Sequence, residues 1–106
     1  MIGAIIGDIV GSIYEFDNHK SKEFDLFSKE STFTDDTVMT VAIAEFLLLD
    51  RQISQSRLCS HLHIWYNKYP ELHVTYGAKF TDWLKQFDDV WYTEYKKGNS
   101  FGNGAA

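Results

Sequence analysis

The chain has a single cysteine and one proline among its 106 residues. One cysteine, Cys59, excludes an internal disulfide and favours a reducing compartment. Because Cys59 lies among Leu58, Leu62 and His63, we expect a small buried side chain rather than a reactive thiol. The apolar opening segment is too short and too rich in glycine to cross a bilayer. It also contains Asp8 and lacks a basic segment, unlike a secretion signal, so we expect a cytoplasmic protein without a membrane partner.

Basic charge is also scarce, and the formal net charge is −5. The longest basic run is Lys96-Lys97, and the other basic residues are scattered. Phosphate backbones repel such a chain unless its basic residues gather on one face, so we expect no nucleic-acid partner. No stretch has the strict alternation of apolar and polar residues that is typical of a strand. The sequence therefore predicts an all-α fold.

Apolar and aromatic residues are plentiful by contrast, at 44% and 16% of the chain. This composition is typical of a sequence that buries a core, and the length allows one domain or a piece of one. Three Trp, six Tyr and eight Phe exceed what so small a domain would bury alone. The surplus predicts a surface for another part of the same protein, for a partner or for self-association.

The opening segment is predicted to form a core helix. Its apolar residues recur at spacings of three and four and share one helical face: Ile2, Ile5, Ile6, Ile9, Val10 and Ile13. Gly3, Gly7 and Gly11 form a second stripe without side chains, which costs about 1 kcal/mol of helix propensity per glycine. We expect compensation from close approach of another backbone, as in helix packing, or of a ligand.

Three further helices follow a polar stretch, residues 16–33, that is predicted to be a loop or a loop with one short element. Residues 37–50 have a broad apolar face, with Thr34, Asp35 or Asp36 as the predicted N-cap. A third helix starts after Ser54 or Ser56 and ends before Pro70, and a fourth covers residues 77–87.

The run Thr34-Asp35-Asp36 is the sharpest candidate for chemistry. Two carboxylates and a hydroxyl are the oxygen ligands that Mg²⁺ or Ca²⁺ prefers. The alternative is a helix N-cap with a spare acid, which is common. The apolar neighbours Phe33 and Val38 favour the metal interpretation, because two carboxylates there repel each other without a cation.

Two weaker candidates accompany it. Glu15, at the end of the glycine-striped helix, is a candidate general base, and the alternative is a solvated surface glutamate. A glycine-rich loop near the end of the chain suits phosphate binding, and the alternative is a plain turn. The loop residues concerned are Ser100, Phe101, Gly102, Asn103 and Gly104. The histidines His19, His61, His63 and His73 have no metal-ligand spacing, and Asp88-Asp89 is assigned to a solvated face.

Taken in this order, residues 3–15 (GAIIGDIVGSIYE), 33–40 (FTDDTVMT) and 100–106 (SFGNGAA) resemble the ADP-ribosylglycohydrolase family of the dinitrogenase-reductase-activating glycohydrolase type. The resemblance runs through the whole chain and covers the N-terminal part of that family's domain. It implies a compact helical fold around two Mg²⁺ ions and hydrolysis of the glycosidic bond between ADP-ribose and an acceptor. The implied partners are ADP-ribosylated substrates or ADP-ribose.

The resemblance also implies roles for the candidates. Thr34, Asp35 and Asp36 would be metal ligands, Glu15 the catalytic acid residue beside the metals, and residues 100–104 the loop around the diphosphate and ribose. Asp8 is expected to have a structural or second-shell role. The family's downstream Asp-x-Asp-Thr motif, which supplies the other ligands, is missing, and the glycine loop does not continue into Met-Arg.

Residues 1–106 are therefore expected to be a partial domain with half of a metal site, inactive or nearly so alone. Two alternatives are a non-catalytic module that binds ADP-ribose or a related nucleotide, and a helical interaction domain.

Overall fold

A computed structural model describes residues 1–85 of the chain, and helices are the regular elements of this range. They are α1 (Ile2–Gly11), the 3-10 helix η1 (Ser12–Tyr14), α2 (Asp35–Leu49), α3 (Gln55–Lys68), the 3-10 helix η2 (Pro70–Leu72) and α4 (Ala78–Lys85). Since residues 1–85 contain no strand, the predicted all-α class is confirmed.

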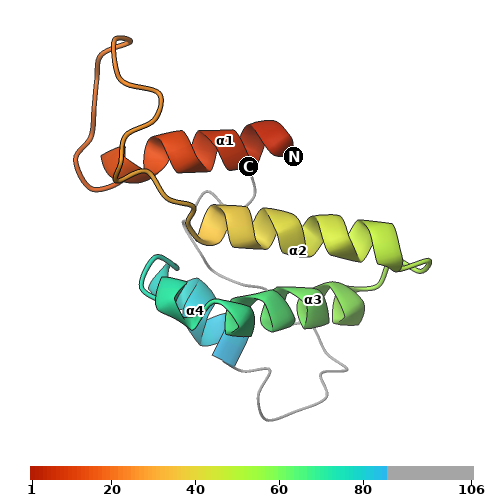
Figure 1. The fold of residues 1–106 in the computed structure, drawn as a ribbon. Coiled ribbons are helices and arrows are strands. Elements are labelled where there is room, and N and C mark those ends of the chain that lie inside the picture. Colours follow the sequence, from red (N-terminus) through yellow and green to blue (C-terminus); the bar gives the residue numbers. More distant parts are fainter. Residues whose placement is uncertain (86–106) are drawn as a thin grey trace.

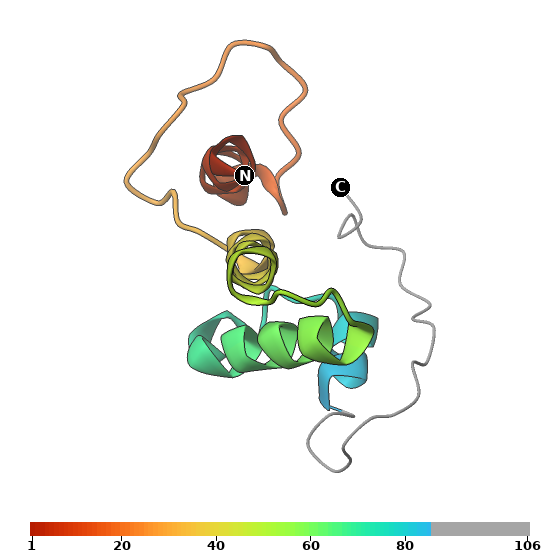
Figure 2. The same ribbon diagram turned by 90° about the vertical axis from the view of Figure 1, so that its right-hand side faces the viewer.

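The helix α2 lies between α1 and α3 (Figure 1). α1 and α2 lie side by side and run in opposite directions (Figure 1). Their axes are nearly parallel, because both helices are seen end-on after a quarter turn (Figure 2). α3 is seen lengthways in both views and therefore crosses α2 obliquely, and α4 packs against α3. The start of α2 thus lies at the same end of the molecule as the end of α1.

The predicted limits of α3 are confirmed, and each has a local cause. The Ser54 side chain accepts a hydrogen bond from the Arg57 backbone N–H at 3.3 Å, which satisfies a donor that the first turn leaves free. The helix ends at Lys68, with Tyr69 as its C-cap, because the following Pro70 disfavours helical geometry in the residue before it. Pro70 itself starts η2.

The core is built by α2, α3, α4 and the segment before α4. Its buried apolar residues are Val38, Ala42, Phe46, Cys59, Tyr66, Tyr76 and Leu84. Tyr66, Tyr76 and Leu84 form one cluster, and Phe80 and Trp83 pack against it as partly buried neighbours. The prediction that Cys59 is buried is confirmed, and this burial raises the pKa of its thiol.

The prediction that the opening segment is a core helix is wrong within residues 1–85. α1 has no buried residue, and Ile2 and Ile6 are 77% and 48% exposed. The reason is that α2 is the neighbouring helix on one side, while a loop without secondary structure lies on the other (Figure 1).

The expected close backbone contact at the glycine stripe is also wrong within this range. A Cβ atom added at Gly3, Gly7 or Gly11 would meet no atom within 4 Å. The space beside these glycines is therefore open in the described part of the chain, and the ligand alternative stays a prediction.

Residues 16–33 form the predicted loop, with neither helix nor strand. The loop arches over the side of α1 that faces away from α2, as both views show (Figures 1 and 2). It carries the exposed aromatic side chains Phe16, Phe24 and Phe27. Part of the predicted aromatic surplus therefore does lie on the surface.

None of the helices within residues 1–85 has both the length and the apolar character that crossing a membrane requires.

Candidate functional site

The start of α2 has the geometry of a capped helix. Thr34 is the N-cap, with extended backbone angles of φ −119° and ψ −166°, and its hydroxyl accepts a hydrogen bond from the Asp36 N–H at 3.4 Å. Asp35 and Asp36 occupy the first turn, where negative charge is favourable beside the helix dipole. Capping therefore accounts for Thr34, and the helix dipole favours both acids.

Asp8 of α1 binds this helix start directly. Its carboxylate accepts hydrogen bonds from the backbone N–H groups of Thr34 and Thr37 at 2.8 and 3.2 Å. The hydroxyl groups of the same two threonines donate to it at 2.5 Å each. A carboxylate with four donors is fully engaged, so Asp8 fastens α1 to α2, in line with its expected structural role.

Asp35, in the first turn of α2, lies within electrostatic reach of two other carboxylates, those of Asp36 and Glu15. Burial raises the pKa of Asp35, and the negative charges of Asp36 and Glu15 raise it further, while a hydrogen-bonding contact with Thr75 opposes them. The Asp35 backbone N–H also donates to Thr75 Oγ1 at 3.3 Å. The fold therefore brings Glu15 close enough to Asp35, 20 residues away in sequence, for the two charges to repel each other.

The start of α2 offers oxygen atoms that a divalent cation could use as ligands. Thr34 Oγ1 already donates to Asp8 and accepts from Asp36, and its oxygen keeps one lone pair for a further partner. Residues 1–85 contain no group of three or more His, Cys, Asp or Glu side chains that could hold a metal ion. One hydroxyl and the carboxylates of Asp35 and Asp36 fit one side of an oxygen-liganded cation, and a complete site needs more ligands.

Sequence analysis missed Tyr76, which lies next to Thr75. Its side chain is 6% exposed, and its hydroxyl has no hydrogen-bond partner among residues 1–85. Burial raises the pKa of this phenol, and the charge of Asp35 and the Tyr66 phenol raise it further. Tyr76 lies between η2 and α4, outside any helical periodicity, so no sequence pattern singled it out.

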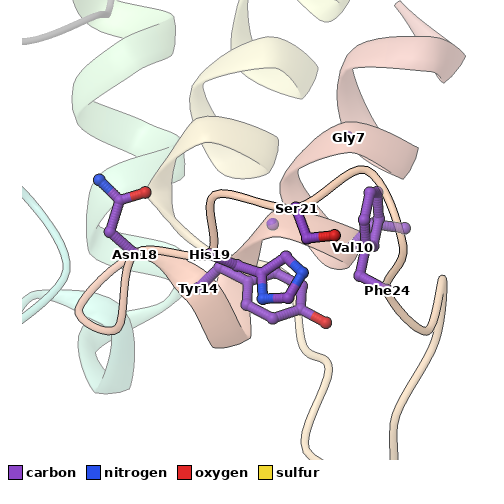
Figure 3. Close-up of a pocket in the computed structure, with 8 residues that line it drawn as sticks. Gly7, Val10, Tyr14, Asn18, His19, Ser21 and Phe24 are labelled. Carbon is purple, nitrogen blue, oxygen red and sulfur yellow. The ribbon is translucent and has the colours of Figure 1, made fainter.

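A separate pocket of about 310 Å³ lies where α1 meets the loop (Figure 3). Tyr14, His19 and Phe24 gather along it, with ring centroids 5.1 to 6.0 Å apart. The other lining residues are Gly7, Val10, Gly11, Asn18 and Ser21. None of the predicted metal ligands lines this pocket, and neither does Glu15.

Most of the histidines make contacts that account for their positions. His61 bridges Glu45 and Asp50, with its two ring nitrogens 3.0 Å from a carboxylate oxygen of each. His73 stacks on Tyr66 at 3.9 Å between ring centroids, and His19 packs on Tyr14.

The predicted phosphate loop and Asp88-Asp89 lie outside the described residues. Within residues 1–85, Thr34, Asp35 and Asp36 therefore lie together at the start of α2, and the charge of Glu15 acts on Asp35.

The described residues form a helical fold in which α2 begins with adjacent oxygen donors, and comparison with known proteins identifies the family of the chain. The family model described as ADP-ribosylglycohydrolase matches residues 1–106, so the chain belongs to the ADP-ribosylglycohydrolase family, as the resemblance predicted. The chain is also similar to ADP-ribosylhydrolase ARH3 of Xenopus tropicalis, with 28% identity over 131 residues. This alignment takes in 100% of the chain and 35% of the relative, so the chain spans about a third of that relative's length. No solved structure matches the chain.

Proposed function

We propose that this chain contributes the catalytic glutamate, Glu15, and one side of the Mg²⁺ site to an enzyme that hydrolyses ADP-ribosyl glycosidic linkages. The family match and the name of the Xenopus relative support the reaction class. The observation that supports the assignment to particular residues is the position of Asp35 at the start of α2, where burial and then the charges of Asp36 and Glu15 raise its pKa. A divalent cation beside them would offset this repulsion.

In this proposal Thr34, Asp35 and Asp36 hold Mg²⁺. Bound Mg²⁺ would supply positive charge that orients the ribose hydroxyls and stabilises the charge developing at the anomeric carbon. Asp8 has a supporting role, because its four hydrogen bonds fix Thr34 and the first turn of α2. The Asp35 N–H bond to Thr75 fixes the same turn from the other side.

Glu15 is proposed to act on the water. As the bond between the anomeric carbon and the acceptor breaks, Glu15 takes a proton from the attacking water and returns it to the acceptor, so that water is added across the bond. The influence of its charge on the pKa of Asp35 supports this role. The loop of residues 100–104 is proposed to wrap the diphosphate of ADP-ribose, as in the family resemblance.

The chain alone is proposed to be inactive or nearly so, because it lacks an Asp-x-Asp-Thr motif to complete the ligand set. Hydrolysis should therefore appear when residues 1–106 replace the matching third of the Xenopus relative in a chimera. The assay measures release of ADP-ribose from an ADP-ribosylated peptide, with and without Mg²⁺.

The matched variants of this chimera are Glu15→Gln, which should lose turnover, and Glu23→Gln, an exposed loop glutamate that should not matter. Removal of a general base costs roughly 10²–10⁴-fold in rate. A chimera that binds ADP-ribose by calorimetry with Mg²⁺ but releases no product would favour the binding-module alternative instead. Turnover by the isolated 106 residues would refute the claim of incompleteness.

A further inference from the structure

The Tyr76 side chain has a buried hydroxyl that makes no hydrogen bond within residues 1–85. Its side chain is 94% buried, since 6% is exposed, and Oη is the buried side-chain polar atom that lacks a partner among residues 1–85. Buried polar groups in folded proteins are nearly always hydrogen-bonded, because an unmet donor loses its water without replacement. Such an atom therefore points to a hydrogen bond that forms in a state other than the one described.

The ring of Tyr76 is held on several sides. It lies edge-on against Tyr66, with centroids 5.1 Å apart and an interplanar angle of 77°. It stacks on Phe80 at 6.0 Å and 20°. With the ring fixed in this cluster, the phenol oxygen has little freedom to seek a partner elsewhere.

The same segment contacts the start of α2. Thr75, the preceding residue, accepts the Asp35 N–H at 3.3 Å and donates to the Leu72 carbonyl at 2.8 Å. The Tyr76 phenol lies within the electrostatic reach of the Asp35 charge. The unpartnered Tyr76 hydroxyl and the acidic residues Asp35 and Asp36 therefore lie in the same region of the fold.

We propose that Tyr76 is a positioning residue whose hydroxyl donates a hydrogen bond to the Asp35 carboxylate when a divalent cation is bound at the start of α2. This inference rests on the proposed function. A carboxylate that binds a cation through one oxygen has lone pairs left on the other, and a donor there fixes its orientation. Tyr76 thus selects the orientation of Asp35 that binds the cation.

The test is a Mg²⁺ titration, monitored by calorimetry, of the chimera in which residues 1–106 replace the matching third of the Xenopus relative, because a complete site needs more ligands than residues 1–85 offer. Tyr76→Phe keeps the ring and removes one oxygen. Outer-shell partners of metal ligands typically contribute 10–100-fold to affinity, so we expect Tyr76→Phe to weaken Mg²⁺ binding about tenfold or more. Stability without Mg²⁺ should be unchanged or higher, because the variant removes an unmet polar group.

Tyr69→Phe is the matched control. The Tyr69 ring is half-buried and packs on Phe33 and Trp65, so the variant also removes one phenol oxygen from a packed ring. We expect its Mg²⁺ affinity to equal that of the wild type. An amide spectrum of each variant without Mg²⁺ establishes that the fold is kept.

Equal Mg²⁺ affinity of Tyr76→Phe and wild type would overturn the inference while leaving the metal site in place. A chimera with the wild-type residues 1–106 that does not bind millimolar Mg²⁺ would instead overturn the metal site, and the role of Tyr76 with it. The two failures are therefore distinguishable.

Discussion

The part of the molecule built from α2, α3 and α4 differs sharply from α1 in how its apolar side chains are covered. The first part has residues such as Ala42 and Leu84 that are 0% exposed, whereas α1 has no buried residue. Yet α1 is as apolar in sequence as any helix in the chain. Apolar periodicity thus identifies the face that a helix can bury, and a packing partner has to be present for that burial to occur.

Hydrogen bonds join the two parts. Asp8 of α1 binds the two threonines at the start of α2, and Ser12 Oγ accepts the Thr32 N–H at 3.1 Å. The candidate site lies at this junction, with Glu15 from one part and Asp35 from the other. Stability is therefore expected to come from α2–α4, and the geometry of the site from the polar junction.

The largest expected effect is a core deletion. Leu84→Ala should lower the free energy of unfolding by about 2–5 kcal/mol, since Leu84 is 0% exposed. Ile6→Ala in α1, where the side chain is 48% exposed, should cost less than about 1 kcal/mol. Urea unfolding followed by circular dichroism measures both. Equal losses would show that α1 belongs to the same core.

The next effect concerns the junction. Asp8→Ala leaves the donors of Thr34 and Thr37 unpaired and should cost about 2–3 kcal/mol. Amide hydrogen exchange should then show protection lost in α1 and retained in α3, because the core does not depend on Asp8. Asp17→Ala, an exposed acid in the loop, is the control. Uniform loss of protection would contradict a two-part molecule.

A smaller effect on the free energy of unfolding, dependent on pH, is expected at the far end of α2, where His61 lies between Glu45 and Asp50. Hydrogen bonds from Trp65 and then His61 lower the pKa of Glu45. Burial alone would raise the pKa of Asp50, but bonds from Arg57 and His61 outweigh it and lower the pKa. A lowered pKa means that the folded state binds protons less readily than the unfolded state.

The stabilisation that Glu45 and Asp50 contribute is therefore fully present at a pH above their ordinary pKa values of 4.5 and 3.8. It is lost as the pH falls through their lowered pKa values. The free energy of unfolding of the wild type should decline between pH 5 and pH 3, and that of Glu45→Gln should decline less. Parallel curves for the two proteins would contradict the assignment.

Much of this fold could be predicted from the sequence. The spacing of Val38, Ala42 and Phe46 predicts the buried face of α2, and Ser54 and Pro70 mark the ends of α3, because caps and proline act locally. The environment of α1 could not be predicted, because the apolar spacing of Ile2 and Ile6 is the same whether or not a partner covers them.

The candidate site was predictable in its residue types and less so in its contacts. Asp35 and Asp36 stand out as adjacent oxygen donors. The four hydrogen bonds of Asp8 and the proximity of Glu15 depend on how α1 lies on α2, which no spacing rule specifies. Tyr76 carries no local signal, because its significance comes from an unmet hydroxyl beside a distant charge.

The most direct measurement of the proposed metal role uses the chimera with the Xenopus relative. It compares the thermal unfolding of the chimera with wild-type residues 1–106 and of its Asp35→Asn variant, with and without Mg²⁺ at neutral pH. Because the pKa of Asp35 is raised by burial and by its acidic neighbours, its ionised form destabilises the folded state as long as no cation is bound. Asp35→Asn should therefore unfold at a higher temperature than the wild type without Mg²⁺. Mg²⁺ should raise the unfolding temperature of the wild type and leave that of Asp35→Asn unchanged. An equal Mg²⁺ effect on both proteins, or no effect on the wild type, would contradict the proposed metal site.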